Sequence, residues 1–239
     1  MPAPPVSRLS VIIPCLDEGA LIRPALRALR PLRDQGCELL LVDGGSRDGS
    51  PQLAVGLVDR LLRSAPGRAR QMNAGASLAS GEILWFLHLD SQIPAGATRL
   101  ILAGLAQSGR GWGRFDIRLS GDRPSLRLVA AMMNLRSRLS GIATGDQGIF
   151  VRRDWFKSLG GYAEMPLMED VEFSRRCKRR GPPLCIPTPL VTSSRRWERD
   201  GVWRTIALMW RLRLAYFLGA DPAQLARRYR PCASPAPES

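Results

Sequence analysis

The chain has 239 residues, 45% hydrophobic and 23% charged, which is the composition of a soluble globular protein with room for a sizeable core. No run of 18 apolar residues occurs, and the opening MPAPPVSR lacks the basic start and apolar stretch of a signal peptide. The five cysteines form no CxxC pair, so we expect reduced thiols in a cytoplasmic protein, with peripheral attachment to the inner face of a membrane as a compatible location.

The formal net charge is +14, and it is concentrated near the C-terminus. Residues 173–230 contain 14 Lys and Arg against 3 Asp and Glu. Such a cluster attracts anions, including phosphates, nucleic acid and acidic membrane surfaces. A solvated face on an arginine-rich protein is the other interpretation.

Short apolar runs alternate with helical patterns over the first 90 residues. The runs predict strands at LSVII (9–13), CELLLV (37–42), DRLLRS (59–64) and EILWFLHL (82–89). The segments with helical spacing are 19–33, 51–57 and 68–79. Continuously apolar strands that alternate with helices predict an α/β fold, with a mostly parallel sheet covered by helices on both faces.

The pattern is looser after Gly96. Strands are predicted at GRFDIRL (113–119) and GIFVRR (148–153), an extended segment at PPLCIPTPLVTSS (182–194), and helices at 124–140, 171–180 and 201–218. There is no repeat and no linker, so we expect a single domain over 9–230, between an N-terminal tail (1–8) and a disordered tail (231–239).

The helix over 201–218 is strongly apolar and also carries arginines. Its apolar residues recur at three- and four-residue spacing, namely Trp203, Ile206, Ala207, Trp210, Leu214 and Phe217. We expect this face to pack on the domain, and a helix lying on a membrane surface is the alternative.

Carboxylates follow three of the predicted strands. Asp17 and Glu18 come after the first strand, Asp43 after the second and Asp90 after the fourth. The carboxyl ends of parallel strands meet at one edge of a sheet, where ligands of such folds bind. We therefore expect a site there, although any one of these residues alone is more often a helix cap or turn residue.

Two further segments bear on the chemistry. The turn DGGSRDGS at Asp43 lacks both the GxxxxGK spacing of a phosphate-binding P-loop and the dinucleotide GxGxxG pattern. Glu169 and Asp170 open a predicted helix, where acidic residues are favoured by the helix dipole and where a carboxylate can also act as a general base.

Taken in order, SVIIPCLDE, LLLVDGGSRDGS, GRARQMNAGASLASGEILWFLHLDS, GGYAEMPLMEDVEFSRR and SRRW resemble the motifs of family 2 glycosyltransferases over roughly residues 9–200. The segments FLHLD, TGDQGIFVRR, LMEDV and RRWER are similar to a small bacterial branch associated with arsenosugar biosynthesis. The resemblance implies a GT-A fold, with a Rossmann-like half (9–95) that binds a nucleotide sugar and a second half (96–230) that binds the acceptor and carries the basic helix.

The resemblance also implies roles for individual residues. Asp170 matches the catalytic base, with Glu169 beside it. Asp90 matches the metal-binding position of the DxD motif, for Mg²⁺ or Mn²⁺, and His88 stands where the first aspartate would be, either as a ligand or as a histidine hydrogen-bonded below the site. The positions that would contact the nucleotide sugar are Pro14, Asp17, Glu18, Asp43, Arg70, Asn73, Arg196 and Trp197.

The implied activity is inverting, metal-dependent transfer of a single sugar from a UDP-type donor to the hydroxyl of a small or lipid-linked acceptor. Ser193 stands where the QxxRW motif of processive members has glutamine, which argues against polymer synthesis. Asp146 and Gln147, in TGDQG, are candidates for acceptor contact or simply form a turn.

The alternative function is that of a basic protein that binds nucleic acid or a membrane surface without catalysis. The sequence shows no helix-turn-helix, zinc-finger or RNA-binding sheet motif, so nucleic acid is not an expected partner.

Overall fold

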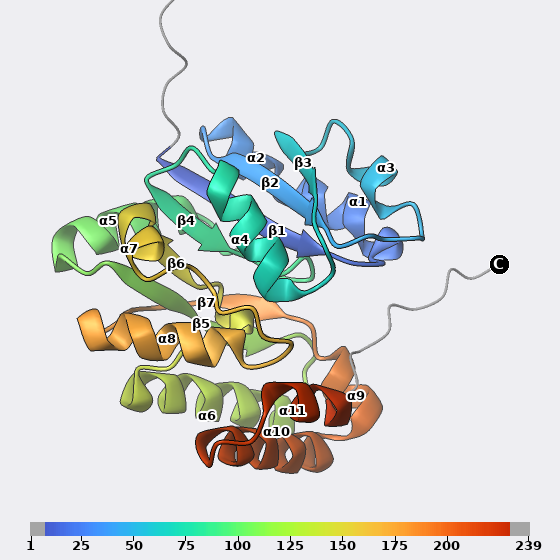
Figure 1. The fold of residues 1–239 in the computed structure, drawn as a ribbon, viewed down its shortest axis with the longest axis vertical. Coiled ribbons are helices and arrows are strands. Elements are labelled where there is room, and N and C mark those ends of the chain that lie inside the picture. The colour runs from blue at the N-terminus through green and yellow to red at the C-terminus, as the bar shows by residue number, and fades with distance from the viewer. Residues whose placement is uncertain (1–7, 230–239) are drawn as a thin grey trace, which may run out of the picture.

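A seven-stranded sheet runs through the part of the chain that the computed structural model describes, residues 8–229 (Figure 1). Its strand order is β3-β2-β1-β4-β6-β5-β7. All neighbours pair parallel except β6, which is antiparallel to β4 and to β5, so the predicted mostly parallel sheet is confirmed. The strands are β1 (Leu9–Cys15), β2 (Glu38–Asp43), β3 (Arg60–Arg63), β4 (Ile83–Phe86), β5 (Trp112–Leu119), β6 (Phe150–Arg152) and β7 (Leu184–Thr192).

Helices cover both faces of this sheet. One face packs against α1 (Gly19–Ala28), α2 (Arg30–Asp34), α3 (Ser50–Ala54) and α5 (Ala97–Ser108). The other packs against α4 (Arg68–Leu78), α7 (Arg153–Ser158) and α8 (Glu169–Arg180). In Figure 1 the remaining helices gather at the lower end, and they are α6 (Pro124–Ser140), α9 (Arg195–Asp200), α10 (Val202–Phe217) and α11 (Pro222–Arg228).

The alternation of side chains along the strands produces the two cores. In β1, Val11 and Ile13 enter the core under α1, whereas Ile12 enters the core under α4. Helix α4 can approach the sheet closely because residue 75 is a glycine, and a Cβ added there would lie only 2.5 Å from Cγ2 of Ile12. Strands buried on both faces explain why β1 and β2 are nearly continuous apolar runs in the sequence.

Several boundaries differ from the sequence prediction. The predicted helix 19–33 is two helices, since Pro31 lies in the first turn of α2 and starts a new helix. Strand β4 ends at Phe86, so the following histidine and aspartate lie on a loop and not at the end of the strand itself. Helices α5, α7, α9 and α11 were not predicted. The predicted tails, 1–8 and 231–239, fall outside the described residues except for Arg8.

The predicted packing of helix 201–218 is wrong for its largest side chains. In α10, Thr205 and Leu212 are buried, and Leu212 joins the small core that includes Met168 and Leu225. The apolar residues expected to pack are instead exposed to solvent by more than half of their surface, namely Trp203, Trp210, Leu214 and Phe217. None of the described helices is both long enough and apolar enough to cross a membrane.

Candidate active site

A cavity of about 1080 Å³ opens at the carboxyl ends of β1 and β4 and extends to α6 and α10. It brings together residues that lie far apart in the sequence. Of the positions predicted to be functional, its lining includes Pro14, Glu18, His88, Asp90, Asp146, Glu169, Arg196 and Trp197. Asp17, Asp43, Arg70, Asn73, Gln147 and Asp170 are not in this lining.

The loop after β4 supplies Asp90, which is 31% exposed and faces the cavity. Its Oδ2 lies 3.6 Å from a guanidinium nitrogen of Arg195, at the start of α9. Strand order places β4 next to β1, so Asp90 and Glu18 line the same cavity from neighbouring strand ends. A carboxylate and a guanidinium in one cavity suit a cation and an anionic diphosphate, respectively.

His88 is mostly buried and contacts the 3₁₀ helix η1 (Gly145–Gln147) with both sides of its ring. Its Nδ1 lies 3.3 Å from Oδ1 of Asp146, and a Cβ added at Gly145 would lie 2.6 Å from its Nε2. Both ring nitrogens therefore face this short helix, which favours the hydrogen-bonded role over metal ligation. A metal-binding role for His88 stays a prediction.

Asp146 is held in its ionised form by its surroundings. Partial desolvation alone would raise its pKa, but the hydrogen bond with His88 and the charges of Arg68 and Arg213 outweigh this effect, so the pKa lies below its ordinary value. Gln147 is fully buried, and its Oε1 accepts the backbone N–H of Thr144 in a capping box, which is consistent with the turn interpretation. Its contact with an acceptor stays a prediction.

Glu169 and Asp170 begin α8 at the edge of the cavity. Glu169 is 5% exposed and lies 3.9 Å from a guanidinium nitrogen of Arg68. Burial, together with the neighbouring charge of Asp170, raises the pKa of Glu169 above its ordinary value.

The Asp170 carboxylate accepts the backbone N–H groups of Gly145, at 2.8 Å, and Val171, at 2.7 Å. It lines a small cavity shared with His88 and Glu169, next to the large one. The sequence motif LMEDV thus places two carboxylates with different environments beside the site.

The loops after β1 and β2 bind each other. The backbone N–H of Asp17 donates to Ser46 Oγ at 2.9 Å, and Arg47 N–H donates to Asp17 Oδ1 at 2.8 Å. Asp43 is fully buried and accepts the N–H groups of Gly45 and Ser46, at 3.1 Å each. These bonds shape the rim beside Glu18, and nucleotide contact by Asp17 and Asp43 stays a prediction.

Two further predicted nucleotide contacts are engaged elsewhere in the structure. The Asn73 side chain exchanges two hydrogen bonds with the backbone of Tyr162, at 2.8 and 2.9 Å. Arg70 pairs with Glu164 at 3.0 Å on the surface. Their contact with a donor also stays a prediction, and what the structure shows is that Asn73 fastens α4 to the loop before α8.

Four arginines of the cavity were missed by the sequence analysis. The cavity is lined by five arginines against four carboxylates, the latter being Glu18, Asp90, Asp146 and Glu169. The missed arginines are Arg68, Arg136, Arg195 and Arg213. Arg195 stands directly before Arg196 in the motif SRRW and could have been found from it, whereas nothing in the sequence marks Arg136.

The described residues of the cavity do not form a complete metal-binding site by themselves. Within residues 8–229 no three His, Cys, Asp or Glu side chains are grouped closely enough to hold a metal ion by themselves. Mg²⁺ is often bound by one or two carboxylates, with substrate phosphates and water as the other ligands. Asp90, partly exposed in a cavity that suits a diphosphate, fits a cation bound together with a phosphorylated substrate.

Covalent catalysis by a cavity thiol is not favoured. Cys15 ends β1 and lines the cavity, but burial raises its pKa to about 12, so the thiol stays protonated at neutral pH.

The comparison with known families decides the identity of the domain. Residues 10–156, well over half of the chain, match the family described as Glycosyl transferase family 2. The chain therefore belongs to the family 2 glycosyltransferases. This result confirms the family that the motifs predicted.

Solved structures of glycosyltransferases share the fold, and the predicted GT-A architecture is confirmed. Staphylococcus aureus TarS residues 1–349, in complex with UDP, superimpose with a TM-score of 0.63 at 17% identity, over 78% of this chain and 60% of that one. The Pyrobaculum calidifontis mannosyltransferase PcManGT, in complex with GDP-Man and Mn²⁺, gives 0.60 at 22% identity, over 93% and 65%. Mycobacterium tuberculosis glucosyl-3-phosphoglycerate synthase, with Mn²⁺, UDP and glucosyl-3-phosphoglycerate, gives 0.55 at 21% identity, over 77% and 70%.

One curated relative is also similar in sequence. It is an uncharacterised protein of Mycobacterium tuberculosis (strain CDC 1551 / Oshkosh), 32% identical over 105 residues, which are 42% of this chain and 32% of that protein. The chain thus spans about a third of that relative's length.

Proposed function

We propose that this family 2 glycosyltransferase is an inverting, metal-dependent enzyme that moves a single sugar from a nucleotide-sugar donor, of UDP type, to the hydroxyl of an acceptor. The observation that carries the proposal is the cavity that Asp90, Arg195 and Glu169 line together, with Asp170 in the small cavity that adjoins it. The Mn²⁺, UDP and GDP-Man present in complexes of proteins with the same fold support a donor of this class.

The donor half of the cavity is assigned to the strand ends. Pro14, Glu18 and Asp90 line it, and Arg195 and Arg196 add positive charge for the diphosphate. A divalent cation, Mg²⁺ or Mn²⁺, would be held by Asp90 and would offset charge on the departing diphosphate. Trp197 lines the same cavity and packs partly against the core below α6.

Asp170 is the proposed base. It takes the proton of the acceptor hydroxyl while the oxygen forms its bond to the anomeric carbon and the bond to the diphosphate breaks, so the nucleoside diphosphate leaves from the opposite face. Glu169, which lines the cavity itself, is the alternative base. The proposal keeps residues 9–95 as the main donor-binding half and residues 96–230 as the acceptor-binding half, from which Arg195 and Arg196 reach the diphosphate.

The finer membership in the arsenosugar branch is part of the proposal and rests on TGDQGIFVRR, LMEDV and RRWER. A cytoplasmic location with peripheral membrane contact is compatible with the exposed side chains of α10.

The test compares Asp170→Asn with Glu169→Gln in single-turnover transfer, beside calorimetric titration of UDP in the presence of Mn²⁺. A general base contributes typically about 10²–10⁴-fold to rate. Asp170→Asn should therefore lose transfer by at least about 100-fold and keep donor binding, because asparagine retains the shape but takes no proton. Transfer by Asp170→Asn at nearly the wild-type rate would contradict the assignment and make Glu169 or Asp146 the base.

A further inference from the structure

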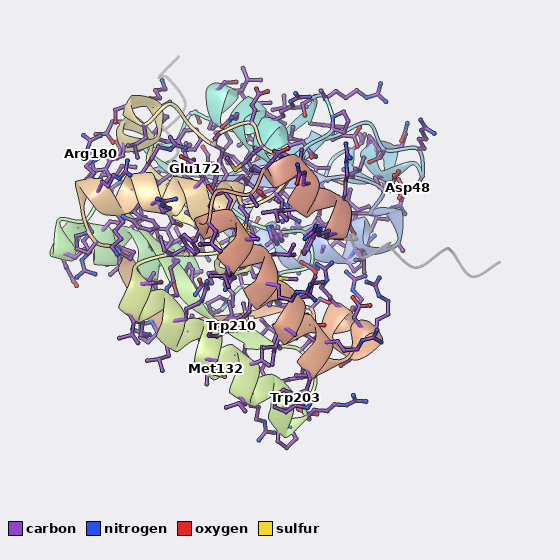
Figure 2. The ribbon with its side chains drawn as sticks, turned by 60° about the horizontal axis from the view of Figure 1, so that its bottom comes forward. Asp48, Met132, Glu172, Arg180, Trp203 and Trp210 are labelled. Carbon is purple, nitrogen blue, oxygen red and sulfur yellow. The ribbon has the colours of Figure 1, made fainter. Side chains whose placement is uncertain are left out.

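Two apolar stripes lie exposed on α6 and α10, beside the cavity. The stripe on α6 consists of Leu128, Met132, Leu135 and Leu139. The stripe on α10 consists of Trp203, Trp210, Leu214 and Phe217. Intervals of three, four and seven residues keep each stripe on one face of its helix. Figure 2 shows Met132, Trp203 and Trp210 on the two helices turned toward the viewer.

These stripes differ from ordinary exposed apolar residues. Elsewhere on the described surface, large exposed apolar side chains such as Val55, Leu61 and Leu78 come from different elements, α4 among them. Single exposed apolar residues are normal in soluble proteins, whereas a contiguous patch marks a binding surface. The α6–α10 surface is therefore the candidate for an apolar ligand.

The cavity of the active site extends between the two stripes. Met132, Leu135, Leu139 and Trp210 line the same cavity as Asp90 and Glu169. An apolar groove between α6 and α10 is thus continuous with the proposed site of transfer. A molecule that fills this groove has one end next to the carboxylates of the site.

Positive charge lies at the inner part of this groove. Helices α6 and α10 each carry three arginines and no acidic residue. Arg136 and Arg213 line the cavity, and burial together with the neighbouring Arg213 charge lowers the pKa of Arg136 to about 10. Within residues 8–229, Nε and Nη2 of Arg136 are buried and have no hydrogen-bond partner.

Two guanidinium groups that repel each other, one with buried unpaired donors, suit an anion that lies between them. Asp170 and Asp146 are close enough to both arginines to affect their pKa values. An anion held by the arginines is consequently near the proposed base.

We propose that the acceptor is an anionic amphiphile, whose charged head is held by Arg136 and Arg213 and whose apolar chain lies in the groove between α6 and α10. The proposal rests on the proposed function, in which a hydroxyl of the head loses its proton to Asp170 and attacks the anomeric carbon as the nucleoside diphosphate leaves. The outer parts of the stripes contact the lipid surface from which the amphiphile is taken, and the arginines of the two helices match an anionic surface.

The experiment measures calorimetric binding of dodecyl phosphate, below its micelle concentration, to the full chain. The comparison ligands are inorganic phosphate, which has the head alone, and dodecyl maltoside, which has an uncharged head. Dodecyl phosphate should bind at least about 100-fold more tightly than inorganic phosphate, because each methylene group buried in the groove adds favourable binding free energy.

Four variants separate the contributions. Arg136→Gln and Arg213→Gln should each weaken dodecyl phosphate binding about tenfold or more, since each removes a charge-assisted hydrogen bond. Met132→Asp should weaken it similarly by placing a carboxylate in the groove, and the variant should stay folded because Met132 is exposed. Val55 is 71% exposed and lies outside the cavity lining. Val55→Asp is therefore the matched control and should bind dodecyl phosphate like the wild type.

Equal affinity for inorganic phosphate and dodecyl phosphate would overturn the proposal in favour of a free-anion site. Unchanged affinity in both arginine variants, or equal affinity for dodecyl maltoside, would overturn it in favour of non-specific apolar adsorption. Titration of UDP with Mn²⁺ on the same preparations separates the two proposals. If the wild type does not bind UDP, the proposed function is refuted, whereas the binding of dodecyl phosphate is measured independently of that result.

Discussion

Gln71 links helix α4 to the ends of two strands beside the site, and the loss of stability on its substitution can be calculated. This side chain on α4 is 3% exposed, and its Nε2 donates to the carbonyl oxygens of Cys15 and Val42, at 2.8 Å each. The two carbonyls belong to the ends of β1 and β2, one directly before the loop that carries Glu18 and the other directly before Asp43, the last residue of β2. One amide therefore holds together the two strand ends on which the donor loops are built.

Gln71→Leu keeps approximately the same volume and removes both donated hydrogen bonds. The Cys15 carbonyl retains the backbone N–H of Gly44, at 2.9 Å. Two hydrogen bonds contribute about 0.5–1.5 kcal/mol each, so the free energy of unfolding should fall by about 1–3 kcal/mol. For a chain of this size, the corresponding fall in melting temperature is about 2–12 °C.

The assay is urea unfolding followed by circular dichroism, with Gln52→Leu as the matched control because Gln52 is exposed on α3. The midpoint of Gln71→Leu should fall with an unchanged slope, and affinity for UDP should fall with it. Equal midpoints for Gln71→Leu and Gln52→Leu would refute the reasoning, since the buried amide would then contribute no more than an exposed one.

The remaining predictions concern the ionisable groups of the site. The pKa of Glu169 is higher in the folded state than in the unfolded state. Its negative charge therefore destabilises the folded protein at pH values above the unfolded-state pKa. Glu169→Gln should consequently melt at a higher temperature than the wild type at neutral pH. The difference should vanish at pH values below about 4, where the carboxyl is protonated in both states, and a difference independent of pH would exclude this cause. His88→Asn should reduce Mn²⁺-dependent UDP affinity far less than Asp90→Ala, because the ring faces Asp146 and Gly145, and an equal loss measured by calorimetry would make His88 a metal ligand.

Most of the donor half of the fold could be predicted because β1, β2 and β4 are buried on both faces. Continuous apolar runs marked β1 and β2, and the carboxylates behind them marked the edge of the sheet. Helix α5 was missed although its residues form helices well, since Gly104 in its middle weakens the pattern. The structure explains that glycine, because a Cβ there would lie 2.6 Å from Cδ2 of Leu184 on β7.

The acceptor side could not be predicted in the same way. Helical spacing shows that Trp203 and Trp210 share a face, but it does not show whether that face meets the core or solvent. The pairing of Arg195 with Asp90 joins residues about a hundred positions apart, and only the fold brings them to 3.6 Å. Burial of Arg136 likewise depends on the cavity between α6 and α10, which no local pattern records.

The central claim is that the cavity binds a nucleotide-sugar donor together with a divalent cation at Asp90. Calorimetric titration of UDP into the wild type and Asp90→Ala, each with and without Mn²⁺, tests it most directly. The wild type should bind UDP tightly only when Mn²⁺ is present, and Asp90→Ala should lose this dependence while remaining folded. Undiminished Mn²⁺-dependent binding of UDP by Asp90→Ala would contradict it.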